Sequence, residues 1–406
     1  LVDTRDKTVT AISPERKLYM DVPNMRLPKD VETTIQKTSE MKDLAGEPGA
    51  ENKETLETAG DAAAAGGVTT FIVMPDTDPV LDSVALVDFI KRRADSVAKV
   101  KVLPTGGLTI DLDGAKMSEI GLIKQAGAAF FTNGDNPVED AGVLRRAMSY
   151  AASFDVLVAS RPDTPSLSKN TVMNAGAFAA RLGLRGAPPE AEWIALERDL
   201  MLAETTGVRL LADCISTARS LAAVERAREA GVKVSCSVAA YSLFFNELDV
   251  GDYLTYCKVQ PPFRIETDRM ALIDGLKRGA IDAVVSAHDP QPTENKRLPI
   301  ADASYGAVGL ETLLSALLSI AIREDVPLLA ALKPVTSGPA DLLGLPQGRL
   351  AKGAPADLVL FDPAAPWACD RDDLSSRSKN SPFDGRKLEG RVLRTWVNGA
   401  TVFERG

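Results

Sequence analysis

The chain of 406 residues is long enough for one large barrel and a small accessory domain. Its composition, 45% hydrophobic and 25% charged, is that of an ordinary globular protein, and its net charge of −9 argues against nucleic acid or an anionic membrane as a partner. No apolar run approaches the roughly 20 residues of a membrane span. The first ten residues also lack a basic-then-apolar signal pattern, so we expect a cytoplasmic protein.

The histidine and cysteine content limits the available chemistry. The only histidine is His288, so any mechanism that needs several imidazoles is excluded. The cysteines show neither a CxxC pairing nor the framework of a small secreted protein. We expect most of them to be reduced and buried as small apolar side chains. They are Cys214, Cys236, Cys257 and Cys369.

From about residue 66, short apolar runs alternate with longer amphipathic segments. The runs are dominated by Val, Ile, Leu, Phe and Ala with little alternation, which is typical of strands buried on both faces. The predicted strands are residues 68–74, 100–103, 128–132, 156–159, 208–212, 232–236 and 281–286. The predicted helices include residues 85–97, 189–205, 217–230 and 268–278.

This alternation predicts an α/β fold, a (β/α)8 barrel. An open doubly wound sheet is the alternative, but no GxGxxG fingerprint follows the first strand, so the barrel is favoured. By position the eighth strand should lie just before Gly46. Residues 34–44 (TIQKTSEMKDL) stand there, and they are polar and poor in strand-forming residues.

After about residue 345 the pattern changes to short strands and turns. Residues 356–361 (ADLVLF) and 392–402 (VLRTWVNGATV) predict a small β domain, and Asn398-Gly399 is a specific hairpin signal. We therefore predict an N-terminal segment at residues 1–40 that could add strands to this domain. The barrel is expected at residues 41–344, and the C-terminal part of the β domain at residues 345–406.

Several motifs, in order and with matching spacing from about Gly46 to Val402, resemble those of the dihydroorotase family of amidohydrolases. Each motif alone is a weak signal, but their joint order is specific. They are Gly46-Glu47-Pro48-Gly49, residues 62–70 (AAAAGGVTT), Met74-Pro75-Asp76, residues 258–264 (KVQPPFR), Gly309-Leu310-Glu311-Thr312 and residues 379–383 (KNSPF).

The resemblance implies a (β/α)8 TIM-type barrel with a small β-sandwich domain formed by the chain ends. Active members of the family reversibly hydrolyse the cyclic amide of dihydroorotate in pyrimidine biosynthesis. They use one or two metal ions, typically zinc, which activate a water and polarise the carbonyl. The ligands stand at the carboxyl ends of the barrel strands.

Matched to these motifs, nearly every metal-binding position of the family carries an unsuitable side chain. The former ligand or base positions are Lys42, Leu44, Asn133, Arg161, Cys214 and Ala287. The positions that remain from the substrate pocket are Gly46, Asp76, Gln260, Arg264 and His288. His288 stands beside the family's metal-binding aspartate position and is not itself a ligand in that motif.

Our leading hypothesis is a non-catalytic dihydroorotase-like subunit with no expected cofactor. The resemblance implies aspartate transcarbamoylase catalytic chains as partners, together with self-association.

Two alternatives remain at this stage. The first is a metal-dependent cyclic amide hydrolase with a rebuilt zinc site made of Cys214, Cys236 and His288. The second is an anion-binding module that uses Lys42, Arg161 and Arg264.

Overall fold

The computed structural model describes residues 2–3, 8–12, 19–22 and 52–406. It separates into two compact units, Leu1–Ala45 and Gly46–Gly406. The first unit contains an antiparallel sheet in the order β1-β2-β3. Its strands are Val2–Asp3, Thr8–Ile12 and Tyr19–Val22. The predicted eighth barrel strand at residues 34–44 lies outside the described residues.

The second unit is built around parallel strands that alternate with helices. β4 (Thr70–Val73) pairs with β5 (Lys101–Pro104). A six-stranded sheet follows in the order β13-β12-β11-β8-β7-β6. The bounds are Gly106–Gly107 for β6, Phe131–Thr132 for β7, Leu157–Ser160 for β8, Arg209–Ala212 for β11, Val234–Ala239 for β12 and Ala283–Val285 for β13. Each predicted strand from residue 68 to residue 286 has a counterpart here, so the predicted barrel class is confirmed.

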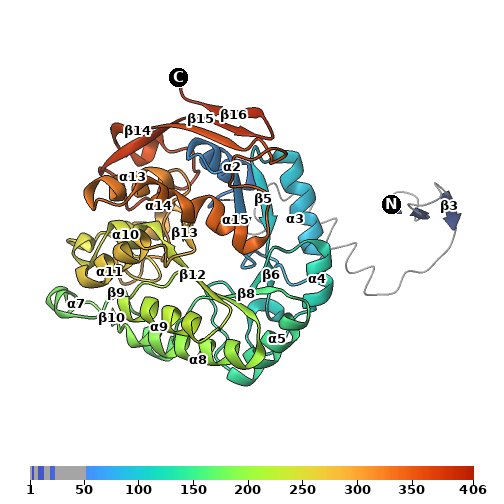
Figure 1. The fold of residues 1–406 in the computed structure, drawn as a ribbon, viewed down its shortest axis with the longest axis horizontal. Coiled ribbons are helices and arrows are strands. Elements are labelled where there is room, and N and C mark those ends of the chain that lie inside the picture. Colours follow the sequence, from blue (N-terminus) through green and yellow to red (C-terminus); the bar gives the residue numbers. More distant parts are fainter. Residues whose placement is uncertain (1, 4–7, 13–18, 23–51) are drawn as a thin grey trace. The chain divides into compact units, whose positions relative to one another are not determined.

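Helices surround these strands, as Figure 1 shows. The longer helices are α2 (Leu56–Ala65), α3 (Val84–Val97), α5 (Ala141–Ser153), α8 (Glu190–Thr206), α9 (Ala218–Glu229), α11 (Glu266–Lys277) and α13 (Leu313–Arg323). The short ones are α4 (Ile120–Ala126), α6 (Pro165–Ser168), α7 (Ala177–Leu182), α10 (Ala240–Phe244), α12 (Thr293–Lys296), α14 (Leu328–Leu332) and α15 (Ser337–Leu343). A two-stranded parallel sheet, β9 (Met173–Asn174) with β10 (Gly186–Ala187), lies between α6 and α8 in the chain.

Local sequence explains where several helices begin and end. The Asp140 carboxylate accepts hydrogen bonds from the Gly142 and Val143 N–H groups at the start of α5. The Thr217 hydroxyl accepts one from the Ser220 N–H at the start of α9. Such side chains satisfy N–H groups that have no partner within the helix. α8 ends at Gly207, whose φ of +70° suits glycine and closes the helix.

Apolar side chains from the strands and the surrounding helices form the main core. A second core beside the barrel mouth is rich in aromatic rings. Phe245 is its centre, because its ring lies 4.7 Å from that of Phe244, 5.1 Å from Phe263 and 4.9 Å from Phe383. Phe383 comes from the family-like segment at residues 379–383, so this motif packs the chain's end against the barrel.

The C-terminal segment forms an antiparallel sheet of β14 (Leu358–Ala368), β15 (Lys387–Val397) and β16 (Ala400–Glu404). Asn398-Gly399 turns β15 into β16 with positive φ at both residues, which confirms the predicted hairpin. One face packs on the barrel, where a Cβ on Gly67 would lie 2.9 Å from the Val359 side chain. Gly67 also has a φ of +78°, so close approach and backbone conformation both require glycine there.

Two contacts tie the start of the described barrel to its C-terminal end. The Glu54 carboxylate accepts hydrogen bonds from the Ser376 hydroxyl and, at 3.1 Å, from the Arg377 N–H. The Thr395 hydroxyl donates to the Ala64 carbonyl at 2.8 Å. Contacts across more than 300 residues make the C-terminal sheet an integral cover of this end of the barrel. The expected limits at residues 40 and 344 remain predictions.

Two buried lysines fix the loop that follows β13. The Lys296 ammonium donates to the carbonyls of Thr255, Lys258 and Ser304 at 2.8–3.2 Å. The Lys258 ammonium donates to the carbonyls of Ile300 and Ala301, both at 2.9 Å. Burial, together with the positive charge of Lys258, lowers the pKa of Lys296 to about 8. These ammonium groups donate to backbone carbonyls of the loop and so connect its segments.

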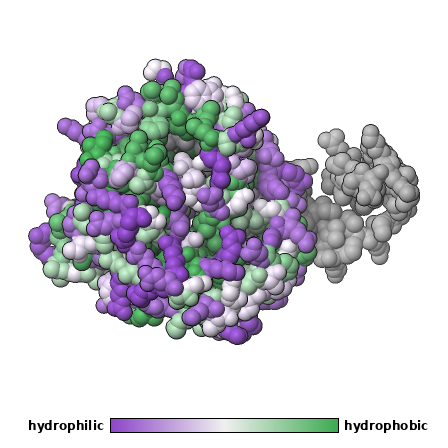
Figure 2. Space-filling view, in the orientation of Figure 1, coloured by the Kyte–Doolittle hydropathy of each residue, from purple (hydrophilic) through white to green (hydrophobic). Residues whose placement is uncertain are grey.

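Within the described part of the chain, no helix is long and apolar enough to cross a membrane. The space-filling view in Figure 2 shows apolar surface in its upper part, where Figure 1 places β14 and α13. Large apolar side chains are exposed on these elements and on neighbouring ones. They include Ile322, Leu329, Leu358, Leu360 and Leu393.

Replacing Phe245 with alanine should lower the free energy of unfolding by about 3–5 kcal/mol, because a large cavity would open in the aromatic core. Urea denaturation measures this loss. The matched control is Leu329→Ala, whose side chain is 81% exposed, with an expected change within about 0.5 kcal/mol. Equal losses in the two variants would contradict the central position given to Phe245.

Candidate functional site

The residues that follow the barrel strands gather at the carboxyl edge of the sheet, as parallel strands require. Asn133 and Asp135 follow β7, Arg161 follows β8, and Cys214 follows β11. Asp289 follows β13. The structure therefore brings together most of the predicted site positions that it describes. Lys42, Leu44 and Gly46 lie outside the described residues.

Arg161 is the central charge of this mouth. Its guanidinium forms an ion pair with Asp135, and Arg161 Nη1 lies 3.5 Å from the Gln260 carbonyl oxygen. Arg161 Nη2 lies 4.0 Å from Cys214 Sγ. Burial acts to lower the pKa of Arg161, but the negative charges near it, first that of Asp135, outweigh burial and hold this pKa well above its usual range. Arg161 is therefore a permanent cation.

Carboxylates surround this cation. Burial, reinforced by the negative charge of Asp135, raises the pKa of Asp76. Burial also raises the pKa of Asp289 to about 6, with Asp135 and Asp76 adding to the shift. An anion entering this mouth would meet these carboxylates, so the anion-binding alternative is electrostatically disfavoured here.

Asn133 and Cys214 both form hydrogen bonds within the protein. The Thr109 N–H donates to Asn133 Oδ1 at 3.0 Å, and Asn133 Nδ2 donates to the Thr109 hydroxyl at 2.8 Å. The Cys214 side chain is buried, and its N–H donates to the Ser237 hydroxyl at 2.8 Å. Burial raises the pKa of the Cys214 thiol far above its usual range, which opposes formation of a metal-binding thiolate.

The rebuilt zinc site predicted from Cys214, Cys236 and His288 is not formed. Cys236 Sγ faces the Ala280 carbonyl at 3.5 Å, and Ala280 precedes β13. His288 follows the opposite end of β13. Throughout the described ranges, no group of three or more His, Cys, Asp or Glu side chains is arranged to hold a metal ion. Sequence proximity to strand ends was misleading because Cys236 lies within β12.

The His288 side chain contacts other parts of the protein. Its Nδ1 accepts from the Gly309 N–H at 3.1 Å, and its Nε2 lies 3.6 Å from Glu54 Oε2. Burial would raise the pKa of Glu54, but its contacts with His288, Ser376 and Thr58 outweigh burial and lower it. The histidine thus joins the loop after β13 to the carboxylate that contacts the C-terminal segment.

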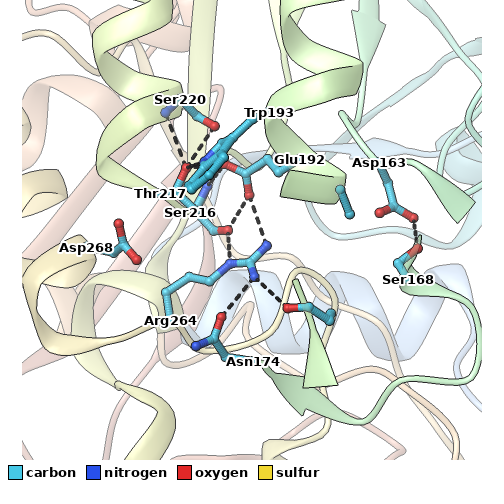
Figure 3. A network of polar contacts seen from close by, with 12 residues as sticks. Asp163, Ser168, Asn174, Glu192, Trp193, Ser216, Thr217, Ser220, Arg264 and Asp268 are labelled. Carbon is cyan, nitrogen blue, oxygen red and sulfur yellow. Dashed lines mark hydrogen bonds and ion pairs between the residues drawn. The ribbon is translucent and has the colours of Figure 1, made fainter. Parts of the chain in front are cut away.

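Arg264 belongs to a separate buried network, shown in Figure 3. Its guanidinium donates to Ser216 Oγ at 2.8 Å and to Asn174 Oδ1 at 3.0 Å, and it pairs with Glu192 at 3.4 Å. The Glu192 carboxylate also accepts from the N–H groups of Ser216 and Thr217. The prediction that Arg264 could bind an anion in the pocket is therefore wrong, because its guanidinium is already bound to Glu192 and the residues beside it.

Sequence reasoning missed Asp135, Tyr241 and Glu192 as partners of the predicted residues. Asp135 stands two positions after Asn133, in a loop that follows a strand. This position in the sequence could have identified it as a residue of the mouth. The Tyr241 hydroxyl donates to the Gln260 carbonyl at 3.1 Å, so Gln260 contributes its backbone oxygen to the mouth. Glu192 could not be identified because it pairs with a residue far along the chain.

Together, the parallel barrel and the positions that follow its strands define an amidohydrolase-type barrel. Similar solved structures include an L-hydantoinase (dihydropyrimidinase) from Arthrobacter aurescens, with a TM-score of 0.80 and 26% identity, covering 88% of this chain and 82% of that one. A D-hydantoinase (dihydropyrimidinase) from Thermus sp. shares the fold, with a TM-score of 0.74, 21% identity and coverage of 87% and 80%.

Sequence comparisons narrow the class. The chain matches the family described as "Dihydro-orotase-like" over residues 40–220 and the amidohydrolase family over residues 185–402. It is 40% identical to a dihydroorotase of Anaplasma phagocytophilum (strain HZ), over 88% of this chain and 80% of the relative. It is 38% identical to a dihydroorotase of Desulforapulum autotrophicum, over 88% and 84%. The chain therefore belongs to the dihydroorotase family of amidohydrolases.

Family membership corrects the expectation of no cofactor. The relatives are named dihydroorotase and belong to the amidohydrolase family, whose members typically depend on a metal ion. At the described positions, however, the side chains present do not fit that ion. Arg161 is cationic, Ala287 has no donor atom, and the Asn133 amide is bound to Thr109.

Arg264→Gln should lower the free energy of unfolding by about 3–5 kcal/mol, because it leaves the Glu192 carboxylate buried without its cation. Chemical denaturation measures the effect. The control is Arg226→Gln, whose partner Glu197 is exposed, with an expected change below about 1 kcal/mol. A small effect of Arg264→Gln would contradict the structural role given to this arginine.

Asp289→Asn should stabilise the protein near neutral pH. The pKa of Asp289 is raised from 3.8 to about 6 in the folded protein. Between these values the folded protein binds more protons than the unfolded chain, so the free energy of unfolding falls as pH rises. The variant removes this loss and gains about 1–3 kcal/mol at pH ~7.5, with little gain at pH ~4.

Thermal or urea unfolding at the two pH values checks this expectation for Asp289. The matched control is Asp252→Asn, an exposed aspartate for which no such pH-dependent gain is expected. A variant that is less stable than the wild type near neutral pH would show that the Asp289 carboxylate is required there as an anion.

Proposed function

We propose that this chain acts in pyrimidine biosynthesis as a dihydroorotase-like protein that does not hydrolyse dihydroorotate by the family's mechanism. In this proposal it serves as a structural subunit for aspartate transcarbamoylase. The observation that carries the proposal is the ion pair of Arg161 with Asp135, at a position where the family's motif has a metal-binding histidine. A guanidinium cannot donate a lone pair to zinc, and it repels divalent cations.

The other described positions support the same interpretation. The family's mechanism needs a base that also binds metal, and Ala287 stands at that position. Asp76 stands where the family binds the substrate carboxylate, and its negative charge would repel that group. Changing one residue would not restore activity, because the replaced positions follow several different strands.

The partner is proposed from the resemblance and is compatible with the surface. Exposed leucines on β14 and β15, among them Leu358, Leu360 and Leu393, stand on a sheet that is fixed to the barrel. Apolar side chains that gather on one surface are common at sites of protein association. A structural subunit needs a rigid surface, and the contact of Glu54 with Ser376 fixes this sheet's connection to the barrel.

An active cyclic amide hydrolase is the second candidate. It is favoured by the 40% identity to a relative named dihydroorotase. This candidate requires a catalytic arrangement that differs from the family's at Arg161, Cys214 and Ala287. The two candidates make opposite predictions for turnover.

The purified protein should hydrolyse dihydroorotate at least about 1,000-fold more slowly than the Anaplasma phagocytophilum relative, because the family's metal ion, which activates the water, would lack its ligands here. The relative is assayed under the same conditions as the positive control. Metal content is measured on both proteins by elemental analysis. Turnover comparable to that of the relative would overturn the non-catalytic proposal.

The partnership is tested separately by mixing the chain with aspartate transcarbamoylase catalytic chains of the same source organism. Size-exclusion chromatography with light scattering should show a complex larger than either component. The Anaplasma phagocytophilum relative mixed with the same catalytic chains is the comparison for specificity. Separate elution of the two components at concentrations well above micromolar would overturn the partnership.

A further inference from the structure

Arg161 joins four segments that are far apart in the sequence. Its backbone follows β8, and its side chain pairs with Asp135 in the loop after β7. It also contacts Cys214 after β11 and the Gln260 carbonyl before α11. The Arg161 side chain is only 15% exposed, whereas its partner Asp135 is 46% exposed, so the ion pair lies at the opening of the mouth with the guanidinium on its inner side.

Several carboxylates lie near Arg161. Burial first, and then the negative charge of Asp135, raises the pKa of both Asp76 and Asp289, while the positive charge of Lys53 acts in the opposite direction. Asp213 adds a further negative charge next to Cys214 and acts on the same guanidinium. A positive charge fixed among these carboxylates reduces their mutual repulsion, although Asp76 and Asp135 are exposed, so solvent screens part of it.

The geometry also distinguishes Arg161 from an ordinary surface ion pair. Exposed pairs such as Arg278 with Glu225 lie on the outside of the helices and hold together two neighbouring elements. Arg161 instead reaches Asp135, Cys214 and Gln260 from one point at the centre of the strand ends. Its planar group suits such a position because it can donate in several directions at once.

We propose that Arg161 is a fixed internal cation that takes the structural and electrostatic place of the metal ion at the family's barrel mouth. It positions the loops after β7, β8 and β11 around one charge, and it holds the Gln260 segment against them. This inference rests on the proposed non-catalytic function. It concerns this position alone and makes Arg161 a positioning residue.

A double-mutant cycle tests the contact that carries the proposal. Arg161→Gln and Asp135→Asn are made singly and together in the full chain, and Tm is measured by calorimetry. Arg161→Gln should lower Tm by about 4–6 °C, and the double variant should lose clearly less than the sum of the single losses. The matched control cycle is Arg278→Gln with Glu225→Gln, where additive changes of about 1 °C or less are expected.

Arg161→Lys separates charge from shape. It keeps the positive charge and should recover at least half of the Tm lost in Arg161→Gln. If Arg161→Gln does not fold while Arg161→Lys does, the requirement for a cation is supported. If Arg161→Lys is as unstable as Arg161→Gln, or if the cycle is additive, the proposal is overturned.

A second measurement has a readout that a merely structural contact would not change. With Arg161 replaced by glutamine, the carboxylates of the mouth lose their cation, so about 1 mM MnCl2 should raise the Tm of Arg161→Gln by at least about 2 °C more than that of the wild type. An equal rise in Tm for the two proteins would overturn the proposal that Arg161 takes the place of the metal ion. Hydrolysis of dihydroorotate by the wild type would overturn the proposed function, whereas an additive cycle overturns only this inference.

Discussion

A parallel barrel places the carboxyl ends of its strands around one mouth, and the chemistry of that mouth depends on the residues that follow each strand. In this chain the sites after β7, β8, β11 and β13 carry Asp135, Arg161, Cys214 and Asp289. Because the scaffold fixes these positions, their charged side chains lie close to one another at the mouth. The Arg161–Asp135 ion pair connects the loops that follow β7 and β8 there.

The two arginines Arg264 and Arg161 differ in how completely their guanidinium groups are hydrogen-bonded. Arg264 donates to Ser216, Asn174 and Glu192, and its network is complete within the protein. Arg161 has fewer close acceptors, and its Nε has no hydrogen-bond partner. The first arginine therefore stabilises a fixed region beside the mouth. The second lies near the carboxylates of Asp76, Asp135 and Asp289, and Lys53 adds another positive charge that acts on Asp76 and Asp289.

Much of the fold could be predicted from the sequence because its signals are local. The apolar run at residues 68–74 became β4, and Asn398-Gly399 became the turn between β15 and β16. The position of Arg161 at the mouth followed from its place directly after a strand. The partner of Arg264 could not be predicted, because Glu192 lies 72 residues away and pairing depends on how α8 packs. Cys236 was misplaced because the predicted strand ended at residue 236, whereas β12 continues to Ala239 and Cys236 lies within it.

The contact between Glu54 and Ser376 has a consequence for synthesis of the chain. These residues are 322 positions apart, and the Glu54 carboxylate is 2% exposed in the folded protein. At a synthesis rate of about 5–20 residues per second, roughly 16–64 s pass between the synthesis of Glu54 and that of Ser376. During that interval the apolar strands that begin with β4 lack their C-terminal cover, so apolar surface that is buried in the folded protein stays accessible until the last segment is made.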